Sequence, residues 1–309
     1  MVVTRLLGGL GNQMFQYAYG LQLARLSSQP LFIDASGFAT YDLHALAITN
    51  LRISAPQLPP HEWKRIPRRF REANRWSDAL LAHCNFLLRS ESRTLSLRRE
   101  RPFGFAEKYL RSATKVYLDG YWQSERFFAG VQQQLRSEFR PKHALSDASL
   151  HVAEKVQSEV SVALHVRRGD YVTNPEAKKI YRNLGRDYYR KCLDDLRQRL
   201  TGLKVFLFSN DVDWCLRELD VGLPFVPVTH NDATTAYEDL YLMSLCDHAI
   251  IANSSFSWWG AFLGENASGR RVYHPDPWFH PGTLNGSFIP CEDWISERNL
   301  SSSLSARAA

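Results

Sequence analysis

The chain is poor in cysteine and has no paired cysteine motif. Its 309 residues include only Cys84, Cys192, Cys215, Cys246 and Cys291, and no two of them form a C-x-x-C pair. An odd number of scattered cysteines argues against a disulfide framework and against a cysteine-ligated zinc site. We therefore expect a protein of a reducing compartment that does not depend on cross-links.

Long apolar runs are also missing. No stretch reaches the roughly 18 apolar residues that a membrane-spanning helix needs. The first residues, Met1–Gly9, lack the charged start and apolar centre of a signal peptide. No motif that combines basic and aromatic residues for nucleic-acid binding is present. These absences predict a cytoplasmic protein that does not bind nucleic acid.

Positive charge is concentrated in one segment. The formal net charge is +6, and residues 61–111 alone hold 13 Lys or Arg against 6 Asp or Glu. Such a patch attracts phosphates or anionic lipid surfaces. A solvated helical face would have the same composition, so both interpretations are open. Peripheral contact with the inner membrane face through residues 61–111 is one expectation.

Strands and helices alternate along the chain. The expected strands are Val2–Leu7, Pro30–Asp34, Lys115–Asp119, Val160–Val166, Val205–Phe208, Phe225–Val228, His248–Ala252 and, last, Arg271–Tyr273. Helices are expected at Arg126–Phe139, Asp187–Leu200, Asp211–Leu219, Ala236–Cys246 and Phe256–Leu263, with a further helix that Asn12 would cap. This alternation predicts an α/β protein with parallel, doubly wound sheets.

Composition suggests two Rossmann-like domains. We predict a first domain over residues 1–145 and a second over 146–290, followed by a C-terminal tail at 291–309. Residues 56–111 begin with several prolines and continue as a basic region that contains Trp and Leu up to about Arg99. They are predicted to be an insertion or helical subdomain of the first domain.

The richest motif is His165-Val166-Arg167-Arg168-Gly169-Asp170-Tyr171. It directly follows the apolar run Val160–Leu164, and ligands of α/β proteins bind beyond the carboxyl ends of such strands. Arginine is well shaped to hold a phosphate with paired hydrogen bonds. Adjacent residues at a strand end point in opposite directions, so we expect only one of the two arginines to face a ligand deeply. The other would pair with Asp170 or lie at the surface.

A glycine loop, Gly8-Gly9-Leu10-Gly11-Asn12-Gln13, precedes the first expected helix. It fails as a dinucleotide fingerprint, because Met14 stands where a third glycine is required, and it lacks the lysine of a P-loop. A flexible turn with two amide side chains at a helix N-terminus suits an anion or a polar substrate. A plain strand-to-helix turn explains the same residues equally well.

Two further motifs follow strands of the second half. Asp239–His248 leads through a strand into Asn253-Ser254-Ser255-Phe256-Ser257-Trp258-Trp259. Hydroxyl and N–H groups at a helix start can hold a phosphate, although Ser254 and Ser255 can also simply cap the helix. Asn210-Asp211-Val212-Asp213 contains a short D-x-D pattern typical of metal-binding sugar-nucleotide sites. Capping by Asp211 is the preferred interpretation of that pattern.

Together these motifs resemble the bacterial α-1,2-fucosyltransferases of glycosyltransferase family 11. The resemblance rests on GGLGNQMFQYAYG at 8–20, HVRRGDY at 165–171, FSND at 208–211 and DLYLMSLCDHAIIANSSFSWWGAFL at 239–263. It implies a GT-B-like fold, with two Rossmann-like domains facing across a cleft. It also implies inverting transfer of fucose from GDP-β-L-fucose to the 2-hydroxyl of a terminal β-galactose, without a metal or other cofactor. Two alternatives stay open: a fucosyltransferase of the same fold with another linkage or acceptor, and a non-catalytic glycan-binding protein. The acceptor would be an oligosaccharide or a lipid-linked precursor of O-antigen or capsule.

The resemblance also implies roles for individual residues. Arg167 would neutralise the leaving diphosphate, and Asp239 would read the guanine. Further contacts with GDP-fucose are implied for Gly9, Gly11, His165, Asn210, Ser254, Ser255 and Phe256. Asn12 would lie at the reacting centre. Two assignments of the acceptor's deprotonation stay open: Asp170 acts as the base, or Asp170 orients Arg167 while Asn12 positions the acceptor.

Overall fold

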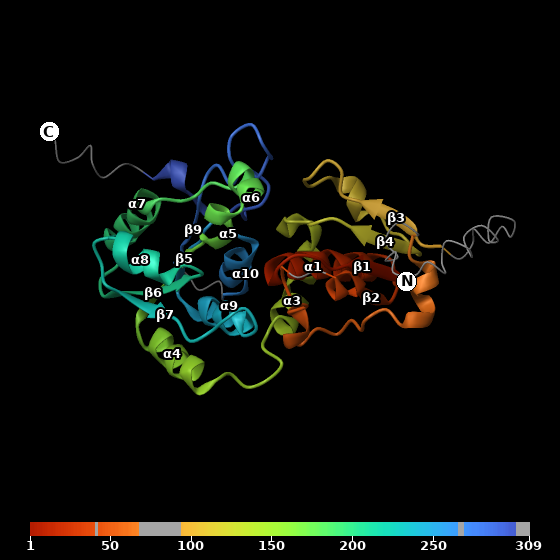
Figure 1. Ribbon diagram of the computed structural model, residues 1–309, viewed down its shortest axis with the longest axis horizontal. Coiled ribbons are helices and arrows are strands. Elements are labelled where there is room, and N and C mark those ends of the chain that lie inside the picture. The colour runs from red at the N-terminus through yellow and green to blue at the C-terminus, as the bar shows by residue number, and fades with distance from the viewer. Residues whose placement is uncertain (41–42, 68–93, 265–268, 301–309) are drawn as a thin grey trace, which may run out of the picture. The chain divides into compact units, whose positions relative to one another are not determined.

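The computed structural model describes residues 1–40, 43–67, 94–264 and 269–300. The chain forms two compact units (Figure 1). Unit 1 comprises Met1–Leu46, Ser54–Trp122 and Arg126–Gln132, and unit 2 comprises Ala47–Ile53, Gln123–Glu125 and Gln133–Ala309. The chain therefore crosses between the units more than once. The domain boundaries after residues 145 and 290 stay predictions.

Unit 1 is built on a parallel four-stranded sheet in the order β2-β1-β4-β3. Its strands are β1 (Val2–Arg5), β2 (Leu31–Asp34), β3 (Ser96–Arg99) and β4 (Val116–Asp119). The long helix α1 (Leu10–Leu26) is buried over most of its surface. Two of its buried polar side chains serve the strand-to-helix connection: Gln13 Nε2 donates to Gly8 O at 2.8 Å, and the Leu7 N–H donates to Gln16 Oε1 at 2.9 Å.

Two predictions about unit 1 were wrong. Asn12 does not cap a helix, because α1 already begins at Leu10 with Gly9 as its N-cap. The predicted helical character of the basic region up to Arg99 fails at β3, which pairs with β4 as an edge strand. Residues 68–93 of that region lie outside the described residues. The described remainder contains the 3₁₀ helices η3 (Pro60–Arg65) and η7 (Glu107–Leu110).

The arginines of β3 explain why a basic segment can form a strand there. Arg98 Nη1 donates to the carbonyls of Tyr109 and Arg111, at 2.7 and 2.9 Å. Arg99 Nε forms an ion pair with Asp119 Oδ2 at 2.5 Å. Arg98 and Arg99 are therefore held by partners inside unit 1 and do not belong to a solvated helical face.

Unit 2 contains a parallel six-stranded sheet in the order β10-β9-β8-β5-β6-β7. Its strands are β5 (Val160–Val166), β6 (Leu203–Ser209), β7 (Phe225–Val228), β8 (His248–Ile250), β9 (Val272–His274) and β10 (Ile295–Ser296). Side chains of β5 and β6 form the centre of a buried apolar cluster with the helix α7 (Arg186–Arg197). The continuous apolar runs predicted as strands are thus buried on both faces, as expected for a parallel sheet.

The helices of unit 2 alternate with its strands as predicted (Figure 1). Two predicted elements, one helix and one strand, need correction. They are α3 (Gln132–Glu138), α4 (Asp147–Ser158), α5 (Gly169–Thr173), α6 (Pro175–Ile180), α7, α8 (Val212–Glu218), α9 (Ala236–Leu245) and α10 (Ser255–Leu263). The helix predicted at Arg126–Phe139 is instead a series of 3₁₀ turns, η8 (Glu125–Phe127) and η9 (Ala129–Val131), followed by α3. Arg271–Tyr273 is not the last strand, because β10 forms within the predicted tail and pairs with β9.

Candidate active site

Three loops of unit 2 meet beyond the carboxyl ends of adjacent strands. The loops after β8, β5 and β6 carry Asn253, Arg167 and Asn210, and these strands lie side by side in the sheet. The Arg168 N–H donates to Asn210 Oδ1 at 2.9 Å, which joins the loops after β5 and β6. The Tyr171 hydroxyl donates to Asn253 O at 3.0 Å, which joins the loops after β5 and β8. This edge is where open α/β sheets bind ligands.

Arg167 and Arg168 have different surroundings. Arg168 lies 3.9 Å over the Trp214 ring, and its Nε pairs with Asp211 Oδ2 at 3.2 Å. Its side chain is only 13% exposed. Arg167 is 26% exposed and pairs with the 45% exposed Asp170, with 2.7 Å between Nη2 and Oδ1. Arg167 is therefore the arginine of the pair that is more available to a ligand. The expectation that the other arginine would pair with Asp170 or lie at the surface was wrong, because Arg168 is largely buried and Asp170 pairs with Arg167.

Gly169 separates the arginines from Asp170 and permits a close approach. Its φ is +26°, and α5 begins there. A Cβ atom at this position would overlap the Asn210 side-chain amide. Since that amide already accepts from the Arg168 backbone, any larger residue would force the two loops apart.

His165 ends the buried part of β5 and is itself 4% exposed. Burial, and then the positive charge of Arg167, lower the pKa of its imidazole to about 3, so the ring is neutral at physiological pH. Its ring centroid lies 5.8 Å from that of Phe256. Within the described residues its Nδ1 has no hydrogen-bond partner. The site therefore contains a buried imidazole in its neutral form.

The serine-rich turn after β8 begins α10. Ser254 is its N-cap and accepts from the Phe256 N–H at 3.3 Å, so its capping role is confirmed. Asn253 is fully buried and donates through Nδ2 to the carbonyls of Arg182 and Trp278, both at 3.0 Å. These bonds fix the start of α10 at the ligand-binding edge. Trp258 and Trp259 are both fully buried and belong to the core.

Asp239 lies in the first turn of α9, which follows the loop after β7. It accepts a hydrogen bond of 2.7 Å from Asn231 Nδ2. Burial, with a smaller contribution from the charge of Glu238, raises the pKa of Asp239 to about 6 despite that hydrogen bond. A carboxylate that is partly withdrawn from water and oriented by an amide is suited to reading polar edges of a ligand.

The D-x-D pattern has a structural role at its first residue. Asp211 caps α8 by accepting from the Trp214 N–H at 3.2 Å, as predicted, and it also pairs with Arg168. Among the described residues, no group of three or more His, Cys, Asp or Glu side chains is arranged to hold a metal ion.

The glycine loop of unit 1 lies beyond the carboxyl end of β1. Gly8 has a φ of +77°, and a Cβ there would come within 2.7 Å of Asn12 Nδ2. Gly9 is the N-cap of α1, while Gly11 and Asn12 lie in its first turn. The structure thus places the Asn12 amide against the backbone of the loop. It places Gly9, Gly11 and Asn12 in unit 1 and all other predicted site residues in unit 2.

Sequence reasoning missed two side chains that support this site. Trp214 underlies Arg168, and Asn231 orients Asp239. Trp214 lies three residues after the N-cap Asp211, so its proximity to that loop was a usable signal. Nothing in the sequence pointed to Asn231, because its partner is eight residues further along the chain.

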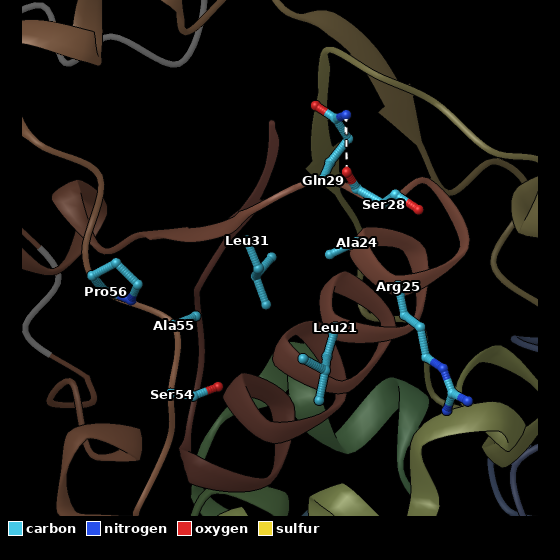
Figure 2. A pocket seen from close by; sticks show the side chains of 9 residues that line it. All are labelled: Leu21, Ala24, Arg25, Ser28, Gln29, Leu31, Ser54, Ala55 and Pro56. Carbon is cyan, nitrogen blue, oxygen red and sulfur yellow. Dashed lines mark hydrogen bonds between the residues drawn. The ribbon is translucent and has the colours of Figure 1, made fainter.

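A cavity of about 350 Å³ lies elsewhere, in unit 1 (Figure 2). It is surrounded by side chains from the last turns of α1, from the start of β2 and from Ser54–Pro56. Leu31, the first residue of β2, lines it, so it lies at the amino end of that strand. None of the predicted site residues lines this cavity, and we do not assign it to the chemistry.

No helix among the described residues is long and apolar enough to cross a membrane.

Comparison with known proteins gives consistent results. The model of the family described as Glycosyl transferase family 11 matches residues 1–273. Over 303 residues the chain is 34% identical to an alpha-1,2-colitosyltransferase of Escherichia coli, with 96% of this chain and 98% of that protein covered. It is 28% identical to the O-antigen biosynthesis glycosyltransferase WbnK of Escherichia coli, with 94% and 98% covered. A crystal structure of NodZ alpha-1,6-fucosyltransferase soaked with GDP-fucose matches with a TM-score of 0.50 at 16% identity, covering 89% of this chain and 94% of that one. This likeness confirms the GT-B-like α/β fold.

The different surroundings of the two arginines lead to a stability prediction. Arg168→Ala should lower the free energy of unfolding by about 1–2 kcal/mol, because it removes the contact with Trp214 and leaves Asp211 without its ion pair. Arg167→Ala should change it by less than about 0.5 kcal/mol, because exposed ion pairs contribute little. Urea unfolding followed by circular dichroism measures both. Equal losses for the two variants would contradict this division.

Proposed function

The chain belongs to glycosyltransferase family 11, and we propose that it is an inverting galactoside α-1,2-L-fucosyltransferase. It would transfer fucose from GDP-β-L-fucose to the 2-hydroxyl of a terminal β-galactose in a surface glycan precursor. The name of NodZ supports a fucosyl donor, and the name of WbnK supports an O-antigen acceptor. The observation that carries the proposal is the partly exposed Arg167 beyond β5, which pairs with the exposed carboxylate of Asp170.

Arg167 has the properties that departure of GDP requires. Negative charge develops on the diphosphate as the bond to the sugar breaks, and a guanidinium held in place stabilises that charge most where water is excluded. Arg168 is already held by Asp211 and Trp214. We therefore assign the diphosphate to Arg167. With a fixed guanidinium in this role, the reaction needs no metal ion.

The ion pair between Arg167 and Asp170 favours one of the two open assignments. A carboxylate 2.7 Å from a guanidinium nitrogen is already engaged by that group and fixes its orientation. Asp170 is thus better suited to orienting Arg167 than to deprotonating the acceptor. Asn12, beside the glycine loop of unit 1, would then position the acceptor hydroxyl.

The remaining site residues would hold the donor. The neutral His165 and the ring of Phe256 would contact the nucleoside, and Ser255 at the first turn of α10 would contact phosphate. Ser254 and Asn210 would contribute mainly by fixing their loops, because their oxygens already accept backbone hydrogen bonds. Gly9 and Gly11 would allow a close approach of the backbone to the donor sugar.

A colitosyl donor is the second candidate, favoured by the 34% identity to an alpha-1,2-colitosyltransferase. Colitose is fucose without its 3-hydroxyl group. A site that binds that hydroxyl by hydrogen bonds would reject the deoxy sugar strongly, whereas an apolar site would discriminate by only about a hundredfold. The ratio of kcat/KM for GDP-fucose and GDP-colitose therefore decides between the two donors.

The main test is GDP release from GDP-fucose in EDTA with lactose as acceptor. We expect release that depends on lactose in the wild type, and a loss of roughly 10²–10³-fold in kcat for Arg167→Ala. Arg197→Ala is the matched control, because Arg197 also pairs with an acid three residues away but lies on α7. Loss of activity in EDTA, or full activity of Arg167→Ala, would contradict the mechanism. If the enzyme turns over GDP-colitose but not GDP-fucose, its donor is GDP-colitose.

Asp239 gives the proposal a pH dependence. As an ionised carboxylate it would accept hydrogen bonds from the guanine, but its pKa of about 6 means that it takes up a proton as the pH falls through 6. Affinity for GDP should therefore weaken below pH 6 by up to tenfold per pH unit. Calorimetric titration of the wild type and Asp239→Asn from pH 5 to 8 measures this. The β-phosphate of GDP also titrates near pH 6. Asp239→Asn lacks the carboxylate, so its pH profile shows the contribution of the phosphate alone. If the wild type and Asp239→Asn lose affinity for GDP in parallel as the pH falls, Asp239 does not bind the guanine.

We also propose that the protein works in the cytoplasm and contacts the inner membrane face through residues 61–111. In the described part of this region, η3 presents Trp63, which is 47% exposed, next to the exposed Lys64. Binding to anionic vesicles in sedimentation should fall as salt increases from about 0.05 to 0.5 M, and neutral vesicles should not bind. Salt-independent binding, or none, would refute the contact.

A further inference from the structure

Tyr171, the last residue of the motif that begins at His165, is held along its whole length. It is 7% exposed, and its backbone N–H donates to Arg168 O at 2.6 Å. Its ring stacks on the ring of Tyr181, with 4.3 Å between the centroids and 12° between the planes. Its hydroxyl donates to Asn253 O at 3.0 Å. Backbone, ring and hydroxyl therefore each have a partner.

The partners of Tyr171 also bind one another. Asn253 Nδ2 donates to the carbonyl of Arg182, the residue that follows Tyr181, at 3.0 Å. The same amide donates to Trp278 O at 3.0 Å. The contacts therefore close a circuit, which runs from the ring of Tyr171 to Tyr181, along the chain to Arg182, and back through Asn253. A ring held in this way is a rigid support, because moving it would break several contacts at once.

The Arg167 guanidinium lies over this ring. Its Cζ atom is 5.5 Å from the centroid of the Tyr171 ring, within the range at which a cation is attracted to the negative face of an aromatic ring. Asp170 holds the same guanidinium through the ion pair of 2.7 Å. An arginine that a fixed ring and a carboxylate already orient loses less conformational freedom when it binds a phosphate, so binding is stronger.

The hydroxyl end of Tyr171 reaches the start of α10. Asn253, whose carbonyl accepts from it, directly precedes the N-cap Ser254, and Ser255 is the first residue of the helix. Burial raises the pKa of Tyr171 well above its usual range, so the hydroxyl stays protonated and remains a donor. One side chain thus connects Arg167 with the helix start that carries Ser255.

We propose that Tyr171 is a positioning residue for the diphosphate, because its ring orients Arg167 and its hydroxyl fixes the start of α10. The diphosphate itself would contact Arg167 and Ser255. Tyr171 would not touch it, since the ring and the hydroxyl are already engaged. The inference rests on the proposed assignment of Arg167 and Ser255 to the diphosphate of the donor.

The test is calorimetric titration with GDP and with GMP, which lacks the terminal phosphate. Tyr171→Leu removes both the ring and the hydroxyl, and it should weaken GDP binding roughly five- to thirtyfold and GMP binding clearly less. Tyr171→Phe keeps the ring and should weaken GDP binding only about two- to threefold, through the loosened start of α10. Equal losses for GDP and GMP in Tyr171→Leu, or equal losses of GDP binding in the two variants, would overturn the proposal.

Tyr188→Leu is the matched control for general damage to unit 2. Tyr188 is also a buried tyrosine, and its hydroxyl donates to the carbonyl of Ile251, just after β8, at 2.5 Å. This variant should lower the stability of the fold and leave the ratio of the dissociation constants for GMP and GDP unchanged. A fall in that ratio equal to the fall in Tyr171→Leu would contradict a role specific to Tyr171.

A double-mutant cycle shows whether the ring acts through Arg167. When Arg167 is already alanine, Tyr171→Leu should cost only the two- to threefold of the lost hydroxyl, about as Tyr171→Phe does. The same loss in both backgrounds would overturn the proposal. If Tyr171→Leu does not fold, a ring-fluorinated phenylalanine replaces it, because fluorine makes the ring face less negative at nearly the same shape. GDP should then bind more weakly than to Tyr171→Phe, and equal affinity would overturn the proposal.

Binding of GDP needs no turnover, and this separates the inference from the proposed function. If the wild type binds GDP with this coupling but transfers no fucose to lactose, the proposed reaction fails and the inference stands. If fucose is transferred but the effects of Tyr171→Leu and Arg167→Ala on GDP binding simply multiply, the inference falls and the reaction stands. A wild type that binds no GDP would overturn both.

Discussion

The hydrogen bond from the Arg168 N–H to Asn210 Oδ1 is the contact on which the geometry of unit 2's ligand-binding edge depends. It fixes the loop after β5 against the loop after β6, and Gly169 leaves the room that it needs. With the backbone held there, Arg168 reaches Asp211 and Trp214, and Arg167 is left beside Asp170. The roles of two neighbouring arginines thus follow from one backbone position.

Much of this edge could be predicted from the sequence, because the central parts of β5 and β6 are buried. Such segments appear as continuous apolar runs, so both strands were located closely, as was the only partly buried β7. Capping by Asp211 and Ser254 was also predictable, because short polar side chains before a helix satisfy its first N–H groups. The end of each apolar run then showed which loops meet at this edge. It did not show which of the two arginines would stay exposed.

The sequence failed where tertiary contacts overrode local preference. Asn12 is a good capping residue, but the cap lies three residues earlier, at Gly9, which adopts the extended cap conformation. The strand β3 was missed because Arg98 and Arg99 lack strand character until β4 and the carbonyls beside it provide partners. Asn231 gave no signal, since its importance depends on the fold bringing its amide against the carboxylate of Asp239 on the following helix.

The paired charges at the His165–Tyr171 motif have a consequence for how a ligand arrives. Arg167 is balanced by Asp170 and Arg168 by Asp211, so this doubly basic segment has little net charge. It therefore creates only a weak long-range field, and it can attract an anionic ligand only over the last few ångströms rather than from a distance. The approach of such a ligand should consequently depend little on ionic strength, because its charge meets Arg167 only at contact.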